Sequence, residues 1–443
     1  MSACGLVIGA PRSGSGKTTL TLALLAAARR RGIKIRAAKS GPDYIDPAFH
    51  AAATGLPSFN LDSWAMAPEQ LGLVGQYAAD AAEFLVIESS MGLFDGVAGP
   101  QGRTGAGGDL AAGLGLPVLL ILDVSGHSQT AAAVARGFIG YAPGVHIAGV
   151  VLNRVASERH REGVAAAMAA AGIKIFGAIP RDQGITLPER HLGLVQALEH
   201  PDLPQHLERL ADLAEKYLDL PAIFALGRPL APGLGADGPL LRPPGQRIAM
   251  AHDDAFSFIY AHVLEGWRRA GSELSFFSPL ADEAPPDHCD SCWLPGGYPE
   301  LHAGRLAVAE NFKAGLAAFA RTRTVHGECG GYMVLGRTLQ SADGAQHPMT
   351  NLLSHATSFA QRRMNLGYRE AVMLADTSLG SAGAVIRGHE FHYASLIAPG
   401  TDEPLAQLRD AAGKALGASG GLRGHVSGAF FHAIATGDAC DRG

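Results

Sequence analysis

The stretch Thr324-Val325-His326-Gly327-Glu328-Cys329-Gly330-Gly331-Tyr332-Met333 decides the fold of the second half of this 443-residue chain. The stretch predicts a buried strand, then a sharp turn that carries one cysteine and is flanked by glycines, and then a helix. The Gly-x-Cys-x-Gly pattern has the shape of a nucleophile elbow, in which glycines let the backbone turn sharply enough to expose a side chain. The pattern therefore predicts a thiol nucleophile, Cys329, in an α/β domain.

A cysteine nucleophile needs a base within reach, and the sequence alone leaves that base open. The chain has 18 histidines, and His432 ends an apolar, strand-like run near the end of the domain. A histidine in this position can equally be a packed residue of the core. The glycine turn 294–300 ends another predicted strand, and its backbone amides are candidate donors to an oxyanion. A glycine turn by itself does not establish an oxyanion hole.

A second motif lies far upstream and has the chemistry of a phosphate site. Ser13-Gly14-Ser15-Gly16-Lys17-Thr18-Thr19 follows an apolar strand and opens a helix, which is the arrangement of a P-loop. Backbone amides from Ser13 to Lys17 would hold phosphate oxygens, Lys17 would reach the β and γ phosphates, and Thr18 would hold Mg²⁺. The position where a full P-loop has its first glycine is Pro11. The motif is therefore a variant, and a plain turn with a helix cap is the alternative interpretation.

Acidic and polar side chains follow the strands predicted beside the P-loop. Glu88 ends one strand, at the edge where ligands of parallel sheets bind, and it is a candidate for Mg²⁺ binding, directly or through water. A solvated strand end is the alternative. Lys39, Asp43 and Asp46 follow another strand and are expected to face the same crevice. The sequence leaves open whether the two acids only stabilise the loop or have a function. Asn153 follows its own strand, where a contact with the base is expected.

The apolar pattern predicts two α/β domains joined by a linker. Short continuous apolar strands alternate with alanine-rich helical stretches such as 18–31, which is typical of a parallel sheet covered on both faces. Residues 221–246 are rich in proline and glycine and predict the linker, so we expect one domain over 1–220 and another over 247–443. The predicted strands cover residues 6–10, 33–38, 84–88, 118–123, 147–153 and 173–179, then 247–251, 274–277, 292–294 and 324–326, with weaker signals at 385–393 and 428–432.

The composition excludes several classes of protein. Apolar residues make up 47% and charged residues 17% of the chain, which is typical of a folded, water-soluble protein. The formal charge of -5 argues against nucleic-acid binding, and the apolar runs are of strand length, too short for a membrane span. Five cysteines, an odd number, argue against a disulfide framework. No signal peptide precedes the first strand, so we expect a cytoplasmic location.

With these motifs in place, the chain resembles a known family over nearly its whole length. It is similar to the glutamine-dependent a,c-diamide synthases of corrinoid biosynthesis, which act on cobyrinic or hydrogenobyrinic acid. Besides the P-loop and the cysteine turn, the matching segments are 41–47, 91–96, 187–194, 294–300 and 387–393. The resemblance implies an N-terminal P-loop domain similar to dethiobiotin synthetase, with a parallel sheet, and a C-terminal class I glutamine amidotransferase α/β domain.

The resemblance also implies roles for particular residues. Cys329 would be the nucleophile and His432 its base, and amides at Gly297 and Gly330 would form the oxyanion hole. Many class I amidotransferases have a glutamate two residues after the histidine, where this chain has Ile434, so the usual orienting acid is missing. In the synthetase domain, ATP would contact Ser13, Gly14, Ser15, Gly16, Lys17, Thr18, Thr19 and Asn153, Mg²⁺ would contact Thr18, Glu88 and Asp43, and Asp46 and Glu88 would lie beside ATP, Mg²⁺ and the substrate carboxylate.

Three alternatives remain open at this point. The first concerns the substrate, which is either the cobalt-containing cobyrinic acid or the cobalt-free hydrogenobyrinic acid. Similarity to the enzymes of the aerobic pathway favours hydrogenobyrinic acid. Cobyric acid synthase amidates other carboxylates of the same macrocycle with similar domains. A regulatory P-loop ATPase of the partition-protein kind, with Arg12 where a signature lysine would lie and a degenerate amidotransferase module, is a third interpretation. It predicts ATP-dependent dimerisation without glutaminase activity. A homodimer is also compatible with the main interpretation.

Overall fold

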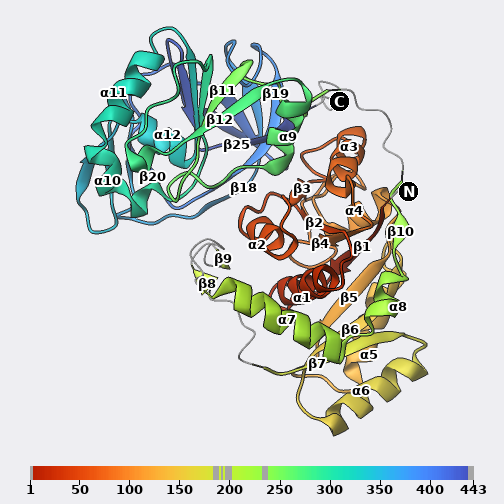
Figure 1. Ribbon diagram of the computed structural model, residues 1–443. Helices are drawn as coiled ribbons and strands as arrows, with labels where there is room; N and C mark the ends of the chain where they lie inside the picture. Colours follow the sequence, from red (N-terminus) through yellow and green to blue (C-terminus); the bar gives the residue numbers. More distant parts are fainter. Residues whose placement is uncertain (1–2, 183–188, 191–192, 195–201, 232–237, 438–443) are drawn as a thin grey trace. The chain divides into compact units, whose positions relative to one another are not determined.

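The computed structural model describes residues 3–182, 189–190, 193–194, 202–231 and 238–437. The chain divides into two compact units, Met1–Ala236 and Asp237–Gly443, which Figure 1 draws in red to green and green to blue. The division falls within the stretch 221–246 that the sequence predicts as a linker. Before it, the same stretch contributes to a short helix and a short strand of the first unit. Part of the segment 187–194 lies outside the described residues.

The first unit alternates strands with helices. Its strands are β1 (Cys4–Gly9), β2 (Ile35–Ser40), β3 (Phe59–Leu61), β4 (Phe84–Glu88), β5 (Val118–Asp123), β6 (Ile147–Val155), β7 (Ile175–Pro180), β8 (Glu189–Arg190), β9 (Gly193–Leu194) and β10 (Arg228–Pro229). Its helices are α1 (Lys17–Arg30), α2 (Ile45–Thr54), α3 (Pro68–Ala79), α4 (Gly107–Gly113), α5 (Thr130–Phe138), α6 (Glu158–Ala170), α7 (Leu203–Tyr217) and α8 (Leu220–Phe224).

The central sheet of the first unit brings the polar strand ends together. The strand order is β3-β2-β4-β1-β5-β6-β7, and β10 pairs with β1. All neighbours on the main path are parallel, while β10 is antiparallel. Because β2, β4 and β1 are adjacent and parallel, the segments that follow them meet at one edge. The register pairs Glu88 with Ile8 on one side and with Lys39 on the other.

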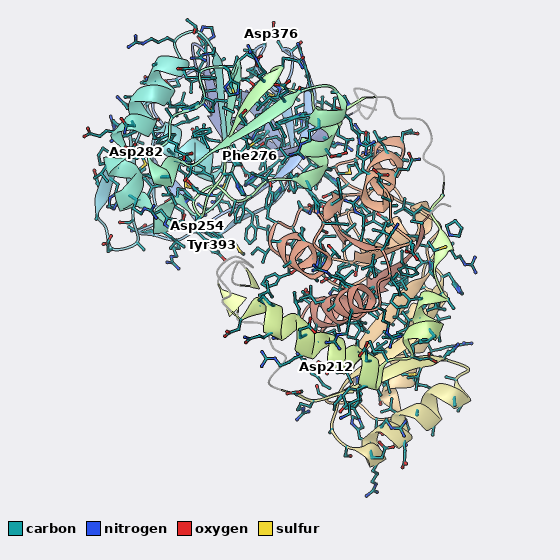
Figure 2. The ribbon with its side chains drawn as sticks, viewed as in Figure 1. Asp212, Asp254, Phe276, Asp282, Asp376 and Tyr393 are labelled. Carbon is teal, nitrogen blue, oxygen red and sulfur yellow. The ribbon has the colours of Figure 1, made fainter. Side chains whose placement is uncertain are left out.

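Helices α1 and α7 pack side by side on this sheet (Figure 1). Leu24 of α1 and Leu210 of α7 are completely buried in the same core cluster, because the apolar residues of both helices face the sheet. At the surface, Arg30 of α1 pairs with Asp212 of α7 at 2.7 Å, and Figure 2 labels Asp212 on that helix. These contacts hold α1 against the sheet and α7.

The second unit contains a mainly parallel sheet, a four-stranded mixed sheet and a five-stranded antiparallel sheet. Its strands are β11 (Arg247–Ala251), β12 (Glu273–Phe277), β13 (Ser291–Leu294), β14 (Thr324–Glu328), β15 (Thr338–Gln340), β16 (Gln346–Pro348), β17 (Ala356–Ser358), β18 (Asn365–Met373), β19 (Val385–His392), β20 (Ser395–Ala398), β21 (Ala406–Asp410), β22 (Ala415–Ser419), β23 (Gly421–Arg423), β24 (Val426–Ala429) and β25 (His432–Thr436). Its helices are α9 (Ala261–Arg269), α10 (Ala303–Val308), α11 (Glu310–Phe319) and α12 (Gly330–Leu335), with 3-10 turns η2 (Pro279–Ala281) and η3 (Pro299–Leu301).

The parallel part of this unit places the cysteine turn at the end of a central strand. The order is β12-β11-β13-β14-β24-β23, with only β23 antiparallel. A separate five-stranded antiparallel sheet has the order β22-β21-β18-β19-β25. The single strand predicted over 428–432 is therefore wrong. It is divided between β24 and β25, because the buried residues Phe430 and Phe431 carry the chain from one sheet to the other, and His432 begins a strand instead of ending one.

One helix of this unit receives its cap from a distant residue. Ala309, which precedes α11, has no side-chain oxygen, and the carboxylate of Asp282 accepts from the amide of Phe312 and from Nδ2 of Asn311, both at 2.9 Å. Asp282, which Figure 2 labels, follows η2, so this cap ties η2 to α11. In the described part of the chain, no helix combines the length and the apolar character needed to cross a membrane.

Candidate active sites

The P-loop joins β1 to α1, and two of its glycines have a left-handed backbone conformation. Gly14 has φ 73°, and Gly16, which precedes α1, has φ 101°, a region that glycine adopts without strain. A β-carbon at Gly16 would lie 2.3 Å from Nδ2 of Asn153, and this amide donates to the backbone oxygen of Ser15 at 2.8 Å. Asn153, on β6, therefore holds the loop from a neighbouring strand, and its contact with a base stays a prediction.

Lys17 begins α1 and is almost completely buried in the loop. Its ammonium donates to the backbone oxygen of Met91. Burial, and then the nearby charge of Lys39, lower the pKa of Lys17 to about 8. Ser13 is exposed and Thr19 is partly buried in the first turn of α1. The structure thus places one buried ammonium at the start of the helix that follows the loop, a position suited to binding phosphate groups.

Glu88 is completely buried at the end of β4, and both of its carboxylate oxygens have partners. Oε1 accepts from Oγ1 of Thr18 at 2.7 Å and from Nζ of Lys39 at 2.9 Å, and Oε2 lies 2.8 Å from Nε2 of His50. Burial alone would raise the pKa of Glu88, but the charges of Lys39 and His50 outweigh it and hold that pKa below its usual range. Glu88 is therefore not the solvated strand end that the sequence left open.

The two predicted aspartates of the loop after β2 take different places. Asp46, in the first turn of α2, pairs with the buried ammonium of Lys39 at 2.5 Å. Burial alone would lower the pKa of Lys39, but Asp46 and Glu88 outweigh it and raise that pKa. Asp43 instead accepts from the amides of Ile45 and Asp46, at 2.7 and 3.2 Å, and caps α2. Lys39 is thus shared by two carboxylates at one strand edge.

These residues can be tested for their fit to Mg²⁺. A hydroxyl and a carboxylate oxygen in contact beside a P-loop are ligands of the kind that Mg²⁺ prefers, so Thr18 and Glu88 fit it. The contacts of Asp43 are with α2 and not with this pair, and its role as a ligand stays a prediction. Among the described residues, no group of three or more His, Cys, Asp and Glu side chains is arranged to hold a metal.

In the second unit, Cys329 occupies a strained turn between β14 and α12. Its φ is 46° and its ψ is −101°, a conformation that costs energy for a residue with a β-carbon. The glycines on either side are required by close packing. A β-carbon at Gly327 would lie 2.6 Å from Cδ1 of Leu335, and one at Gly331 would lie 2.0 Å from the backbone oxygen of Leu294. The turn thus has the geometry of a nucleophile elbow.

The structure brings His432 and Cys329 together across Gly296. A β-carbon at Gly296 would lie 2.4 Å from Cε1 and 3.3 Å from Nε2 of His432, and 3.4 Å from Cβ of Cys329. The bare α-carbon of Gly296 therefore leaves the space in which the imidazole faces the cysteine. The two predicted oxyanion residues are also neighbours, because a β-carbon at Gly330 would lie 3.0 Å from the amide nitrogen of Gly297.

The environment of Cys329 makes a base necessary. The side chain is 2% exposed, and burial, then the carboxylate of Glu300, raise the pKa of the Cys329 thiol. A thiol with a raised pKa is protonated at neutral pH, and attack requires the thiolate. Its proton must therefore pass to a neighbouring group as the sulfur reacts, and His432 is placed for that transfer.

Two further side chains lie against His432. Glu328, the residue before Cys329, accepts from the amide of Ala433 at 2.9 Å through Oε1, and its Oε2 lies 3.8 Å from Nδ1 of His432. The ring of His389 stacks on that of His432 with centroids 5.0 Å apart and 19° between the planes. Burial, and then the charge of His432, lower the pKa of His389 well below its usual value, so His389 is neutral where it stacks.

Fold and sites together define a chain that combines a nucleotide-binding domain with a glutamine amidotransferase domain. Residues 6–195 match the family described as CobQ/CobB/MinD/ParA nucleotide binding domain, and residues 247–440 match the family described as CobB/CobQ-like glutamine amidotransferase domain. The chain belongs to the hydrogenobyrinate a,c-diamide synthase family. The resemblance drawn from the motifs, and the fold class that it implied, are therefore confirmed.

The family assignment depends on relatives that match along their whole length. A hydrogenobyrinate a,c-diamide synthase of Mesorhizobium japonicum is 62% identical over 99% of this chain and 100% of its own. Proteins of the same name from Agrobacterium fabrum and Rhodobacter capsulatus are 58% and 54% identical, over 99% and 97% of this chain and 100% and 98% of their own. The solved structure of chloroplast FtsY from Physcomitrella patens is 17% identical over 47% of this chain and 66% of its own, with a TM-score of 0.31, too low to add to the assignment.

Sequence reasoning missed two residues of these sites, His50 and Glu328. His50 lies four residues after Asp46, and this helical spacing put both on the face of α2 that meets Glu88. Glu328 is an acid at the end of a mostly buried strand, directly before the cysteine. Helical spacing in the first case, and an acid that ends a buried strand in the second, were the available signals.

Proposed function

We propose that this chain catalyses the glutamine- and ATP-dependent amidation of the a and c carboxylates of hydrogenobyrinate. The observation that carries the proposal is a buried cysteine on an elbow facing a histidine in one unit, with a P-loop lysine and a carboxylate cluster in the other. Relatives that match the whole chain are named hydrogenobyrinate a,c-diamide synthases. One unit would release nitrogen from glutamine and the other would use it.

In the proposed glutaminase half, Sγ of Cys329 attacks the side-chain amide carbon of glutamine. The thiol proton passes to His432, which gives it to the departing nitrogen, so that ammonia leaves and a thioester remains. Water then attacks the thioester, glutamate leaves and the thiol is restored. Amides of Gly297 and Gly330 stabilise the oxyanion in both steps.

In the proposed synthetase half, a carboxylate of the macrocycle attacks the γ-phosphorus of ATP, ADP leaves, and ammonia then replaces phosphate on the acyl phosphate. Lys17 and the loop amides balance the charge that develops on the transferring phosphoryl group. The buried ammonium of Lys39 holds Asp46 and Glu88 together at the same edge, beside the place proposed for the substrate carboxylate. Mg²⁺, when bound, would be held by Thr18 and Glu88 and would neutralise charge on the β and γ phosphates.

The division of labour has a chemical reason. A carboxylate is a poor electrophile for ammonia, so it must first be activated by phosphorylation. Ammonia that reached bulk water would be lost as ammonium, because its conjugate acid has a pKa above neutrality. We therefore expect ammonia to pass between the two centres along a protected route.

The test separates the two halves by the source of nitrogen. Cys329→Ser should lose glutamine-dependent amidation and keep amidation with added ammonium salt, because the sulfur serves only to release ammonia. Lys17→Ala should lose both, because both need the acyl phosphate. Product amides are counted by mass spectrometry. If the Cys329→Ser variant forms no amide with added ammonium salt, the role of Cys329 in ammonia release alone is wrong. If Lys17→Ala keeps either activity, the role of Lys17 in phosphoryl transfer is wrong.

The same assay decides between substrates. Hydrogenobyrinic and cobyrinic acids are offered with glutamine and ATP, and we expect two amides on hydrogenobyrinic acid, at the a and c positions. Amidation of other carboxylates would favour the cobyric acid synthase alternative. ATP-dependent dimerisation of the chain without glutamate release would favour the regulatory ATPase.

A further inference from the structure

We infer that Glu328 is the carboxylate that positions His432, a role that class I amidotransferases commonly give to a glutamate two residues after the histidine. That place is taken here by Ile434, which is completely buried and apolar. The inference rests on the proposed roles of Cys329 and His432. It assigns the third member of the catalytic group to the strand of the nucleophile instead of the strand of the base.

The first argument is the path of the chain around Glu328. Glu328 ends β14 and pairs in register with Ala429 at the end of β24, and the amide of Cys329 donates to the oxygen of Ala429 at 2.8 Å. Three residues after Ala429 the chain returns at His432, so β25 begins beside the Glu328 side chain. The amide of Ala433 therefore reaches Oε1 of Glu328 at 2.9 Å.

The second argument is the orientation of the imidazole. Oε2 of Glu328 lies 3.8 Å from Nδ1 of His432, while Nε2 lies on the side of Gly296 and Cys329. A carboxylate on the Nδ1 side and a nucleophile on the Nε2 side is the arrangement by which an acid orients a catalytic histidine and stabilises its cationic form. At 3.8 Å the separation is too long for a hydrogen bond, and it becomes an ion pair when His432 takes up the thiol proton.

The third argument is electrostatic. Glu328 is 5% exposed and lines, with Ala433, a small hollow whose other walls are mainly apolar side chains, among them Trp267 and Trp293. A charge in such surroundings is weakly screened and acts strongly on its neighbour. Cys329 also lies near His432, and two histidines interact with it: His389, which stacks on its ring, and His392. Burial lowers the pKa of both histidines. Glu328 places a negative charge beside the imidazole.

The decisive variant is Glu328→Gln, because a glutamine oxygen can still accept from the Ala433 amide while the charge is lost. We expect kcat for glutamine hydrolysis to fall at least about tenfold, with little change in KM for glutamine and in ammonia-dependent amidation. The rate at which a diazoketone analogue of glutamine alkylates Cys329 should fall in parallel. Glu370→Gln is the matched control. It removes the charge of a carboxylate that pairs with Arg387 at 3.5 Å, on the antiparallel sheet that also carries His432. This variant should leave kcat unchanged.

Each outcome decides the inference. Wild-type kcat in Glu328→Gln, together with a fall in Glu328→Ala, would reduce Glu328 to a structural partner of Ala433 and overturn it. Hydrogen exchange at the Ala433 amide reports whether Glu328→Gln keeps its fold. If it does not fold, Glu328→Asp carries the test: it keeps the charge and should retain more kcat than Glu328→Ala, and equal rates would overturn the inference. A Cys329→Ser variant that still uses glutamine would instead defeat the proposed function itself.

Discussion

At the scale of the residue, the amidotransferase site depends on one missing side chain. The space at Gly296 is taken up by the ring of His432, so Gly296→Ala must displace the imidazole from Cys329. We expect glutamine-dependent amidation to fall about a hundredfold or more, because general acid–base catalysis contributes on that order. Ammonia-dependent amidation should be unchanged.

Gly304→Ala provides the control for this prediction. Gly304 lies in α10, and the nearest atom to a β-carbon there would be Cε1 of His347 at 4.0 Å, an ordinary contact. This variant should keep wild-type activity with glutamine. Both rates are measured from the amides formed, and full glutamine-dependent activity in Gly296→Ala would contradict the close approach.

Single functional residues could be predicted from the sequence where their chemistry requires particular residues next to them in the chain. Cys329 and Lys17 stand out because an elbow and a phosphate loop each need glycines at fixed spacing. His50 and Glu328 do not stand out, because their roles depend on which strand or helix happens to lie beside them. Such contacts follow from the topology, which local sequence does not reveal.

At the scale of the element, the cap of α11 can be tested directly. Asp282→Ala removes the carboxylate that accepts from Phe312 and Asn311, and we expect the free energy of unfolding of the second unit to fall by about 1 kcal/mol. Asp282→Asn should lose less stability than Asp282→Ala, because its one oxygen can still accept from the Phe312 amide and asparagine tolerates the φ of 60° at this position, although the bond from Asn311 is lost. Urea unfolding measures both, and equal losses would mean that the cap contributes little.

Strands were predicted well where both faces are buried. The parallel strands β1, β4 and β5 are continuous apolar runs, so their positions agree with the sequence to within a few residues. The three-residue strand β3 and most antiparallel strands after α12 were not predicted, because they are short or partly exposed and carry polar residues. The break between β24 and β25 lies within one apolar run and was invisible for that reason.

At the scale of the whole molecule, the second unit should be sensitive to mild acid. Six histidines among its described residues are buried. Burial lowers the pKa of four of them to about 4: His262, His326, His355 and His392. Unfolding returns each to about 6.5. The unfolded chain therefore binds more protons between these values, so the stability present above pH 6.5 is lost as the pH falls towards 4, by about 1.4 kcal/mol per pH unit for each histidine.

The pH effect is measured as the urea midpoint of the second unit at pH 7 and pH 5.5, read by pulsed hydrogen exchange at one fixed labelling pH. The midpoint should be lower at pH 5.5, before most carboxylates are protonated. His262→Gln should reduce the difference, because it removes one of the four groups, whose Nε2 donates to the oxygen of Ile434 at 3.1 Å. Equal midpoints at the two pH values would contradict the burial of neutral imidazoles.

The positive φ of Cys329 has a consequence for the durability of this domain. Holding a residue with a β-carbon in that conformation costs on the order of 1–3 kcal/mol, which glycine would not incur. A glycine there would give a sturdier domain that has lost its reactive sulfur. Selection for heat resistance alone would therefore favour replacing Cys329 by glycine. The cysteine is kept only as long as its chemistry is needed.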